Sequence, residues 1–436
     1  MITEKDVKAV ILAAGKGTRM KSDLPKVLHE IFAKPLLKYV TDAVDNTGMV
    51  FEKIVITGHC SETVEGFVEK NIENAKCVLQ YPQRGTGDAV MKAVPLLEDF
   101  HGTVIVLCGD TPLLTSETLK AFICAHKNSG AALTVMSARF ENPTGYGRIV
   151  KDCEGGLERI TEEKDADERV KAIKEVNAGV YCFEKDLIFP LLNELTGNNA
   201  QGEYYLTDTV ELARAKGYKT CSFEIEDNSE IFGINSKEQL SRATSILNKK
   251  TIARLYESGV NIVDAENVYI SPDTTIGADT TILPFVYITG KNVIGNHCKI
   301  GPFSHIRGDV TIGNNVRIGN FVEIKKSVIK DNTNVSHLSY VGDSEVGRGV
   351  NVGAGTITAN YDPVLKTKSK TIIKDGANTG SNTVLVAPVE MEENSMTAAG
   401  TVLRKKAEAN SLVITGTPQK AISGWVAKRK NKNGEK

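Results

Sequence analysis

The stretch from residue 294 to residue 324 reads Ile294-Gly-Asn-His-Cys-Lys-Ile300-Gly-Pro-Phe-Ser-His-Ile306-Arg-Gly-Asp-Val-Thr-Ile312-Gly-Asn-Asn-Val-Arg-Ile318-Gly-Asn-Phe-Val-Glu-Ile324. Isoleucine returns at every sixth position, and glycine often follows it directly. The same spacing extends back toward the N-terminus without a break. Isoleucine therefore occupies positions 270, 276, 282, 288, 294, 300, 306, 312, 318 and 324.

A period of six does not match one face of a helix, but it is a multiple of the two-residue period of a strand. The spacing predicts a three-sided solenoid in which each six-residue side contributes one inward apolar residue. Glycine or asparagine turns each corner, and three sides make a coil of about 18 residues that stacks on the next at about 4.8 Å. The register slips near Ile329, and a lysine-rich segment interrupts it between Tyr361 and Thr371. Segments that interrupt a repeat are frequent functional sites.

The N-terminal third has a different texture, in which short apolar runs alternate with amphipathic stretches. This alternation predicts a parallel sheet covered by helices on both faces, with ligands bound beyond the carboxyl ends of the strands. The expected strands are Val7–Ala13, Lys53–Thr57, Thr103–Cys108 and Ala131–Ser137, and the expected helices are Pro35–Asp45, Glu62–Asn71, Thr86–Leu97 and Ser116–His126.

Three regions follow from these textures. Residues 138–233 are more irregular and are predicted to continue the first domain and to close over its substrate. Ser236-Lys-Glu-Gln239 matches a capping box and predicts the start of a linker helix. We therefore expect an α/β domain over residues 1–235, a linker helix over 236–258, and a β-helix domain over 259–436 with a disordered polar tail from Lys428 to Lys436.

Composition limits the classes of partner. The 436 residues carry a formal net charge of -1 with 25% charged residues, which argues against nucleic acid or an anionic membrane as the main partner. The first ten residues lack the apolar core of a signal peptide, and no run of 18 apolar residues occurs. The eight cysteines include no C-x-x-C pair. These features predict a cytoplasmic protein that acts on small molecules.

The first expected strand leads into Leu12-Ala-Ala-Gly-Lys-Gly-Thr-Arg-Met20, followed by Leu24-Pro-Lys-Val-Leu-His29. The glycines at positions 15 and 17 allow the backbone to approach phosphates with its N–H groups. Arg19 and Lys26 add the positive charge that a triphosphate requires. No P-loop pattern is present, so the stretch indicates a different kind of nucleotide site.

A candidate metal site lies at the end of a later strand, in Leu107-Cys-Gly-Asp110. Mg²⁺ takes one or two protein oxygens and completes its shell with water and phosphate. Asp110 supplies a carboxylate, and Asn235 in Phe232-Gly-Ile-Asn235 supplies an amide oxygen. Two other roles stay open: Asp110 as the partner of a helix N-terminus, and Asn235 as the N-cap of the linker helix.

His337 is the candidate catalytic base of the C-terminal half. It stands in Ser336-His-Leu-Ser-Tyr-Val-Gly-Asp343, just after the slip in register. Histidine titrates near neutrality and can accept a proton from a reacting group. A lone histidine is more often structural, so the assignment depends on its neighbours.

Together these motifs resemble the bacterial bifunctional N-acetylglucosamine-1-phosphate uridylyltransferase/glucosamine-1-phosphate N-acetyltransferases, over nearly the whole chain from Val7 to about Ala421. The resemblance implies a Rossmann-like nucleotidyltransferase domain and a left-handed parallel β-helix. It also implies a homotrimer, Mg²⁺ as cofactor, and synthesis of UDP-N-acetylglucosamine for peptidoglycan and lipopolysaccharide precursors. The substrates would be UTP, acetyl-CoA, glucosamine 1-phosphate and N-acetylglucosamine 1-phosphate.

The resemblance also implies roles for residues in both halves. In the N-terminal domain, the uridine would contact Leu12, Ala13, Ala14, Gly15, Gln80, Gly85 and Thr86, and the sugar would contact Gly147, Glu162 and Asn177. In the β-helix, His337 would be the general base, the sugar phosphate would contact Arg307, Lys325, Tyr340, Asn351 and Lys366, and acetyl-CoA would contact Ala354, Asn360, Tyr361, Ser381 and Ala399.

The sequence departs from the family pattern at two places. Pro363 follows Asn360-Tyr-Asp362 where glycine is usual, and the loop after it is longer, which puts the role of Lys366 in doubt. Gly416 stands where many relatives carry an arginine that helps to bind coenzyme A, so that affinity is expected to be weaker unless Lys428 and its neighbours substitute. One alternative function stays open: a single nucleotidylyltransferase whose β-helix serves only assembly or regulation.

Overall fold

The computed structural model of the chain describes residues 6–416, 419–426 and 428–429. The chain forms two compact units, Met1–Leu247 and Asn248–Lys436, and the boundary falls within helix α8 (Lys237–Glu257). Most of the tail predicted to be disordered, Lys430–Lys436, lies outside the described residues. Among the helices described, none is both long enough and apolar enough to cross a membrane.

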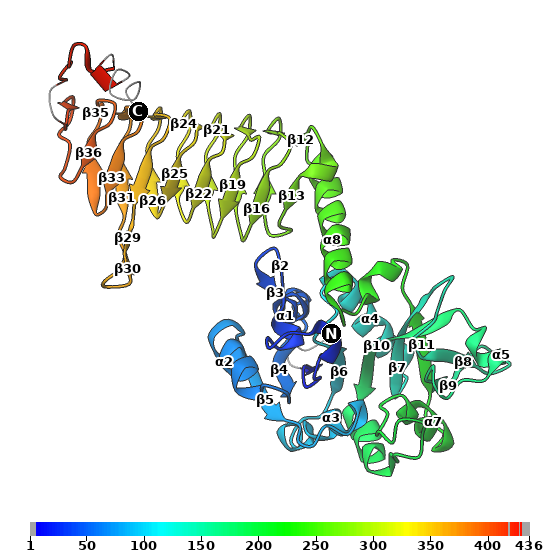
Figure 1. The fold of residues 1–436 in the computed structure, drawn as a ribbon. Helices are drawn as coiled ribbons and strands as arrows, with labels where there is room; N and C mark the ends of the chain where they lie inside the picture. The colour runs from blue at the N-terminus through cyan, green and yellow to red at the C-terminus, as the bar shows by residue number, and fades with distance from the viewer. Residues whose placement is uncertain (1–5, 417–418, 427, 430–436) are drawn as a thin grey trace. The chain divides into compact units, whose positions relative to one another are not determined.

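The N-terminal unit is built on one twisted sheet (Figure 1). Its strand order is β11 (Thr220–Glu224), β7 (Leu133–Arg139), β10 (Glu175–Glu184), β6 (Thr103–Cys108), β1 (Val7–Leu12), β4 (Val50–Thr57) and β5 (Ala75–Leu79). A hairpin of β8 (Arg148–Lys151) and β9 (Leu157–Thr161) joins this sheet through β10.

The sheet is mixed: the four strands predicted as parallel run in the same direction, and an antiparallel strand from the region after residue 137 lies among them. β1 pairs in parallel with β4 and β6, as expected. β10 enters between β6 and β7 and runs antiparallel to both. Only the short helix α5 (Glu168–Lys171) lies between the β8–β9 hairpin and β10, which is too little for the long crossover connection that a parallel strand requires.

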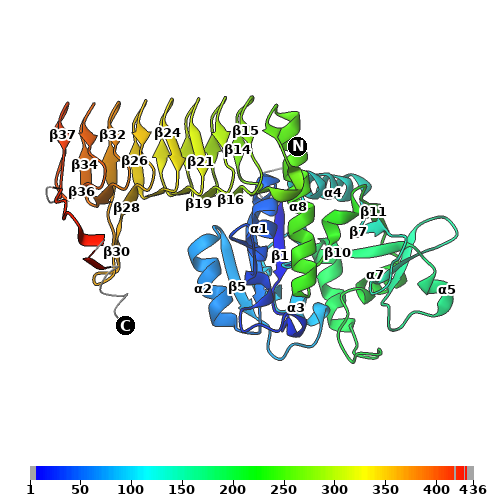
Figure 2. The ribbon, with the colours of Figure 1, turned by 45° about the horizontal axis from the view of Figure 1, so that its top comes forward.

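Helices cover both faces of this sheet (Figure 2). In β1, Ala9 and Ile11 join the core on one face with α1 and α4, and Val10 joins the core on the other face with α3 and α7. Burial on both faces explains why the strand sequences are apolar throughout. The helices are α1 (Leu36–Asn46), α2 (Ser61–Asn71), α3 (Thr86–Met91), α4 (Ser116–Ser129), α5 (Glu168–Lys171), α6 (Lys185–Ile188) and α7 (Asp208–Ala215).

Helix α8 begins at the predicted capping motif. The Gln239 main-chain N–H donates to Ser236 Oγ at 3.2 Å. The reciprocal bond goes one residue further back than in a standard capping box, since the Asn235 N–H donates to Gln239 Oε1 at 2.7 Å. The cap therefore also fixes the backbone of Asn235, a candidate metal ligand.

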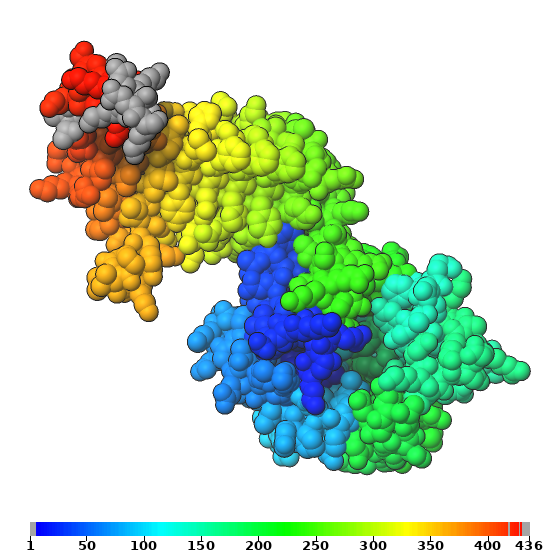
Figure 3. All heavy atoms as spheres, in the orientation of Figure 1, coloured from blue at the N-terminus to red at the C-terminus, as the bar shows by residue number. Residues whose placement is uncertain are grey.

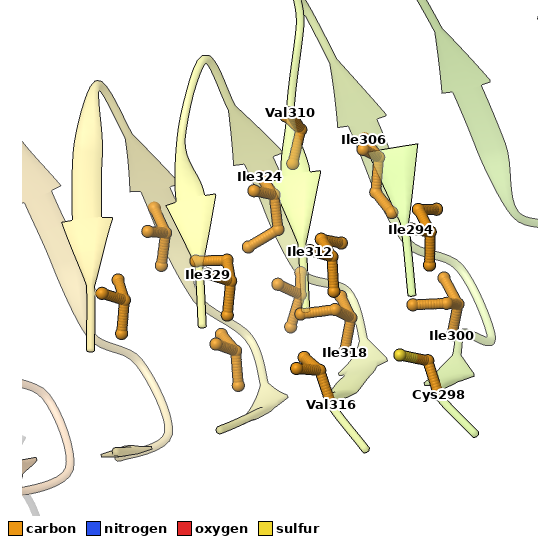
Figure 4. Packing of buried hydrophobic residues seen from close by; sticks show 14 of the residues in the cluster. Ile294, Cys298, Ile300, Ile306, Val310, Ile312, Val316, Ile318, Ile324 and Ile329 are labelled. Carbon is orange, nitrogen blue, oxygen red and sulfur yellow. The ribbon is translucent and has the colours of Figure 1, made fainter. Parts of the chain in front are cut away.

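The C-terminal unit is the predicted β-helix of hexapeptide repeats. Each isoleucine of the ladder is at most 6% exposed, and Figure 4 shows successive isoleucines pointing into the interior of the coils. Strands one coil apart pair in parallel, for example Ile276 with Ile294 and Ile294 with Ile312. Full burial of such a side chain contributes about 1.5–3 kcal/mol, so the ladder forms a continuous core.

Each side of the prism is a parallel sheet. The first runs β12 (Asn261–Ile262), β15 (Thr281–Ile282), β18 (Lys299–Ile300), β21 (Arg317–Asn320), β24 (Asn334–His337), β27 (Asn351–Val352), β32 (Asn378–Thr379), β35 (Met396–Thr397) and β37 (Leu412–Val413). The second runs β13 (Tyr269–Ile270), β16 (Tyr287–Thr289), β19 (His305–Arg307), β22 (Glu323–Lys325), β25 (Tyr340–Gly342), β28 (Ile357–Ala359), β33 (Val384–Val386) and β36 (Val402–Leu403). The third runs β14 (Thr275–Ile276), β17 (Val293–Ile294), β20 (Thr311–Ile312), β23 (Val328–Ile329), β26 (Ser344–Val346), β31 (Thr371–Ile373) and β34 (Val389–Met391).

Both irregularities of the repeat have structural counterparts. At the slip the coil shortens by one residue, so that Ile312 pairs with Ile329. At the lysine-rich interruption the coil lengthens, and Val346 pairs with Ile373. The added residues form a hairpin of β29 (Tyr361–Asp362) and β30 (Thr367–Lys368), which projects from the side of the β-helix (Figure 3).

Candidate active sites

The N-terminal unit contains a pocket beyond the carboxyl ends of β1 and β6. It gathers residues from segments far apart in the sequence, as expected for the end of an α/β sheet. Its walls include most of the residues predicted to hold the nucleotide, namely Leu12, Ala13, Ala14, Gly15, Lys26, Gln80, Gly85, Thr86 and Asp110. Lys16, Gln83, Cys108 and Glu203, which the sequence analysis did not single out, also line it.

Lys26 joins the two candidate metal ligands. Its ammonium donates to Asp110 Oδ2 and, at 3.0 Å, to Asn235 Oδ1. Gly17 allows the glycine-rich loop to pack against the stem of Lys26, because its φ is 59° and a Cβ there would lie 2.8 Å from Lys26 Cβ. The carboxylate and the amide oxygen thus converge on one positive charge.

Two glutamine side chains, Gln80 and Gln83, form hydrogen bonds with the backbone around the pocket. Gln80 follows β5, is 3% exposed and donates to Gly85 O at 2.9 Å. Gln83 donates to Ala14 O at 2.7 Å, which ties it to the glycine-rich loop. The repeated glutamine in Gln80-x-x-Gln83 is the sequence feature that could have pointed to the second one.

The three residues predicted to hold the sugar lie together beside this pocket. The Asn177 N–H donates to Gly147 O at 2.9 Å, and a Cβ on Gly147 would lie 3.4 Å from Glu162 Oε2. The pKa of Glu162 is raised, mainly by burial and further by Asp208 and other nearby carboxylates.

A buried arginine holds the loop that carries Gly147. Arg148 is 1% exposed, and its guanidinium donates to Tyr146 O and pairs with Glu163 at 2.8 Å. Glu163 also accepts the Gly145 N–H at 3.2 Å. Arg148 and Glu163 therefore tie the loop to the strand that ends beside Glu162.

Arg19 lies apart from these groups. It lines a separate groove with Phe232, Ser236, Glu238, Gln239 and Arg242, at the start of α8. The structure thus brings Lys26, but not Arg19, to the Asp110 side chain.

In the β-helix, the candidate base lies on one edge of the prism. The Asn320 carbonyl accepts the Leu338 N–H at 3.1 Å, and the His337 carbonyl accepts the Gly355 N–H at 3.4 Å. Coil stacking therefore places Asn320, His337 and Ala354 in successive layers. Two further layers continue the edge, since Ala354 O accepts from Asn382 N at 2.7 Å and Ser381 O accepts from Gly400 N at 2.8 Å. The candidate acetyl-CoA residues Ala354, Ser381 and Ala399 thus share the edge of His337.

The imidazole ring of His337 contacts the side chain of Asn320. It is exposed, and its Nδ1 lies 3.1 Å from Asn320 Oδ1. An amide oxygen only accepts, so this contact favours the tautomer with the proton on Nδ1 and the lone pair on Nε2. Nε2 is therefore the nitrogen that can take up a proton.

A cluster of cations lies on the adjoining side of the prism. β19 and β22 pair Arg307 with Lys325, and Arg307 also pairs with Glu323 at 2.6 Å. Tyr340 stands in the next strand of the same sheet, opposite Glu323. Lys368, in β30, lies beside Lys325, and this second cation is the main cause of the lowered pKa of Lys325.

The remaining predicted residues are more dispersed. Lys366 occupies an exposed turn position with a φ of 53°, so the structure brings Lys368 rather than Lys366 to Lys325. Asn360 lies 3.4 Å from the Tyr340 hydroxyl, Tyr361 is exposed, and Asn351 stands on the side of the prism that carries His337.

Both family departures lie at exposed positions. Pro363 stands within the β29–β30 hairpin, which Asp362 stabilises by accepting the Val364 N–H at 2.8 Å. Gly416 is exposed, and a side chain there would meet no neighbour within the described residues. The adjoining Thr417 and Pro418 lie outside those residues.

Comparison with known proteins agrees with both architectures. The nucleotidyl transferase family model matches residues 8–236, and the bacterial transferase hexapeptide (six repeats) model matches residues 293–326. The bifunctional protein GlmU of Pelobacter propionicus is 42% identical over 463 residues, covering 98% of this chain and 100% of that protein.

Two further relatives match to the same extent. The bifunctional protein GlmU of Thermoanaerobacter pseudethanolicus is 43% identical, covering 96% of this chain and 97% of its own. That of Clostridioides difficile is 40% identical, covering 98% and 99%. The protein combines a nucleotidyltransferase domain with a hexapeptide-repeat transferase domain, and the chain belongs to the GlmU family of bifunctional enzymes.

Proposed function

We propose that the enzyme makes UDP-N-acetylglucosamine in two steps, the first in the β-helix and the second in the N-terminal unit. Acetyl-CoA acetylates glucosamine 1-phosphate, and UTP then uridylylates the product with release of pyrophosphate. The product serves peptidoglycan and lipopolysaccharide synthesis in the cytoplasm. The observation that carries this proposal is the convergence of Lys26, Asp110 and Asn235 in the nucleotide pocket, together with the shared edge of His337, Ala354, Ser381 and Ala399.

In the uridylyl step, a phosphate oxygen of N-acetylglucosamine 1-phosphate attacks the α-phosphorus of UTP. A P–O bond forms there, the bond to the β-phosphate oxygen breaks, and pyrophosphate leaves. The chain contributes position and charge. Gln80 and Gly85 bind the base, Gly147, Glu162 and Asn177 bind the sugar, and Lys26 neutralises phosphate oxygens.

The residues present suit Mg²⁺ as the metal of this step. Within the described residues, no group of three or more His, Cys, Asp or Glu side chains could form a closed metal cage. Asp110 and Asn235 offer a carboxylate and an amide oxygen that already face one cation, which is the sparse oxygen set that Mg²⁺ accepts alongside phosphates. When bound, Mg²⁺ would supply charge against the triphosphate and the leaving pyrophosphate.

In the acetyl step, the amine of glucosamine 1-phosphate attacks the thioester carbonyl. A C–N bond forms, the C–S bond breaks, and coenzyme A leaves as the thiolate, which takes up the proton that the amine has given to His337. His337 Nε2 accepts the proton that the amine loses, and Asn320 holds the imidazole in the required state. Arg307, Lys325 and Lys368 hold the phosphate.

The proposal includes assembly of the chain into a homotrimer through the β-helix. A column of exposed phenylalanines runs along the prism, with ring centroids 4.7 Å apart for Phe285 and Phe303 and 5.2 Å apart for Phe303 and Phe321. Leu338, 60% exposed and next to His337, follows Phe321 by one coil. Exposed apolar surface of this kind is typical of subunit contacts, and a neighbouring subunit would give the exposed His337 a second wall.

The decisive experiment measures both half-reactions on the purified chain. Release of coenzyme A from acetyl-CoA and glucosamine 1-phosphate, followed with a thiol reagent, tests the first step. Pyrophosphate release from UTP and N-acetylglucosamine 1-phosphate, with and without Mg²⁺, tests the second. Both activities are expected, and chelation should remove only the second. Absence of coenzyme A release would favour a β-helix that serves only assembly.

A further inference from the structure

Gln80 is locked in one orientation by hydrogen bonds to both hydrogens of its amide. Nε2 donates to Gly85 O at 2.9 Å and to Asp88 Oδ2 at 2.8 Å. Both partners are acceptors only, so reversing the amide would bring oxygen against oxygen at both contacts. The orientation of the amide is therefore dictated by chemistry, and Oε1 is its only remaining polar atom.

Asp88 is fixed as firmly as the amide it binds. It lies in the first turn of α3, and its side chain is 2% exposed. Its Oδ1 faces Arg84 at 3.2 Å and Lys92 at 3.7 Å, which leaves Oδ2 for Gln80. A buried carboxylate with two cations on one oxygen is a stable acceptor for the glutamine on the other.

The free oxygen of Gln80 has no partner in the part of the chain that the structure describes. Gln80 lines the nucleotide pocket beside Gly85 and Thr86. A base in this pocket therefore meets a hydrogen-bond acceptor at Gln80 and never a donor. Uracil carries a ring N–H at N3, whereas cytosine carries a bare nitrogen there.

We propose that Asp88 sets the base specificity of the enzyme by orienting Gln80, so that the pocket accepts uracil and rejects cytosine. The inference rests on the proposed uridylyl transfer and on placement of the base against Gln80. Asp88 is a positioning residue, because it acts on the base only through Gln80. A ligand that leaves a buried polar group of the site without a hydrogen-bond partner is strongly rejected.

Removing the charge of Asp88 should relax this specificity. In Asp88→Asn and Asp88→Ser, residue 88 can donate as well as accept, so only Gly85 O still opposes reversal of the Gln80 amide, and the base can meet either end of it more readily. We expect the ratio of kcat/KM for UTP to that for CTP to fall by about tenfold to a hundredfold, since a hydrogen bond to a charged group no longer fixes the amide. Most of the change in this ratio should come from a higher kcat/KM for CTP.

The control variant is Lys92→Ala, which removes an ion pair to Asp88 but leaves the bond to Gln80. It should keep the wild-type ratio. Thermal melting checks the fold of each variant, and Asp88→Ser decides the question if Asp88→Asn does not fold. Calorimetric binding of UTP and CTP provides a second readout that does not depend on turnover.

The outcomes separate this inference from the proposed function. Folded Asp88 variants that keep the wild-type preference for UTP would overturn the inference alone. A wild-type enzyme that uses CTP as well as UTP would overturn the inference and leave nucleotidyl transfer standing. A wild-type enzyme that transfers neither nucleotide would contradict the proposed function, and the inference would fall with it.

Discussion

The two candidate sites of this chain are built in opposite ways. In the N-terminal unit, loops beyond the strand ends surround a pocket, and its polar groups are already bonded to one another, as Lys26 is to Asp110 and Asn235. In the β-helix, isoleucine fills the interior, so functional groups can lie only on the outer edges and faces. His337 is accordingly exposed. An α/β sheet can enclose a ligand by itself, whereas a filled prism requires a further surface to enclose one.

The contrast also extends to charge. The predicted sugar side of the N-terminal pocket gathers carboxylates, and burial, followed by the neighbouring carboxylates, raises the pKa values of Glu162 and Asp208. The β-helix face gathers Arg307, Lys325 and Lys368, and the pKa of Lys325 is lowered first by Lys368, then by burial and Arg307. The first cluster suits hydroxyl and amide donors, and the second suits a phosphate. The predictions below test whether the two sites are as independent as this difference implies.

The largest effect is expected from Asp110→Asn. The substitution removes the carboxylate on which the proposed metal depends, so uridylyl transfer should fall by about a thousandfold or more. Acetyl transfer should stay at the wild-type rate. Pyrophosphate release and thiol release, measured on the same preparation, check both statements. Normal uridylyl turnover would remove Asp110 from the site, and a parallel loss of acetyl transfer would show that the sites are coupled.

His337→Ala should produce the reciprocal result. Loss of a general base lowers a rate by about 10²–10⁴-fold, so thiol release should fall by that factor while pyrophosphate release is unchanged. Asn320→Ala is the matched variant, because it keeps the imidazole but frees its Nδ1–H. A smaller loss of acetyl transfer is expected there. Equal rates for His337→Ala and the wild-type protein would exclude His337 as the base.

The sequence predicted the β-helix in more detail than it predicted the α/β unit. The isoleucine spacing repeats a one-dimensional rule, and every coil is held by contacts with adjacent coils, so Ile306 could be placed without knowledge of distant residues. The position of β10 could not be placed in this way. Its antiparallel pairing with β6 and β7 joins segments far apart in the chain, and a strand pattern does not reveal its direction.

The site residues also divide into those that a local sequence motif reveals and those that only contacts between distant segments reveal. Gln80 and Asp110 lie in motifs, and the pocket contains both. Asp88 belongs to no motif that the sequence analysis used, because its importance comes from the distance between its carboxylate and the Gln80 amide. Lys368 was passed over for Lys366 because the longer β29–β30 hairpin shifts the position that faces Lys325. Motifs identify residues that contact a ligand, and only the fold identifies those that position them.

Arg148→Met should weaken the sugar side of the N-terminal site and leave the β-helix intact. The guanidinium loses its bonds to Tyr146 O and Glu163, and breaking a buried pair costs about 3 kcal/mol. We expect a lower melting temperature and a severalfold higher KM for N-acetylglucosamine 1-phosphate, with the KM for UTP unchanged. Steady-state kinetics with each substrate varied in turn provides the measurement. An equal rise in both KM values would indicate general damage to the fold.

Asp208→Asn should stabilise the same unit, but only at higher pH. Burial, with Glu211 and Asp165, raises the pKa of Asp208 from 3.8 to about 6. Because the folded-state pKa lies above the unfolded value, ionisation above about pH 6 destabilises the folded protein, and this penalty disappears below the unfolded pKa. Asparagine avoids it, giving about 1–2 kcal/mol at neutral pH after allowance for solvent screening. Melting curves should therefore separate at neutral pH and coincide well below the unfolded pKa.

The smallest effect concerns phosphate binding on the β-helix. The pKa of Lys325 is lowered from 10.5, first by the neighbouring amine of Lys368, then by burial and Arg307. A phosphate binds the protonated lysine, so affinity should begin to fall at a lower pH than for an isolated lysine. The inhibition constant of N-acetylglucosamine 1-phosphate in acetyl transfer measures this, because this product has no amine that titrates.

Lys368→Gln distinguishes a cationic cluster from independent surface lysines. The substitution removes the main cause of the lowered pKa of Lys325, so the alkaline loss of affinity should move to higher pH. Affinity at neutral pH should weaken at the same time, because one cation is gone. The two changes have opposite signs, and a general disturbance of the face would not produce both. A pH profile that keeps its position in Lys368→Gln would mean that Lys325 and Lys368 bind the phosphate independently.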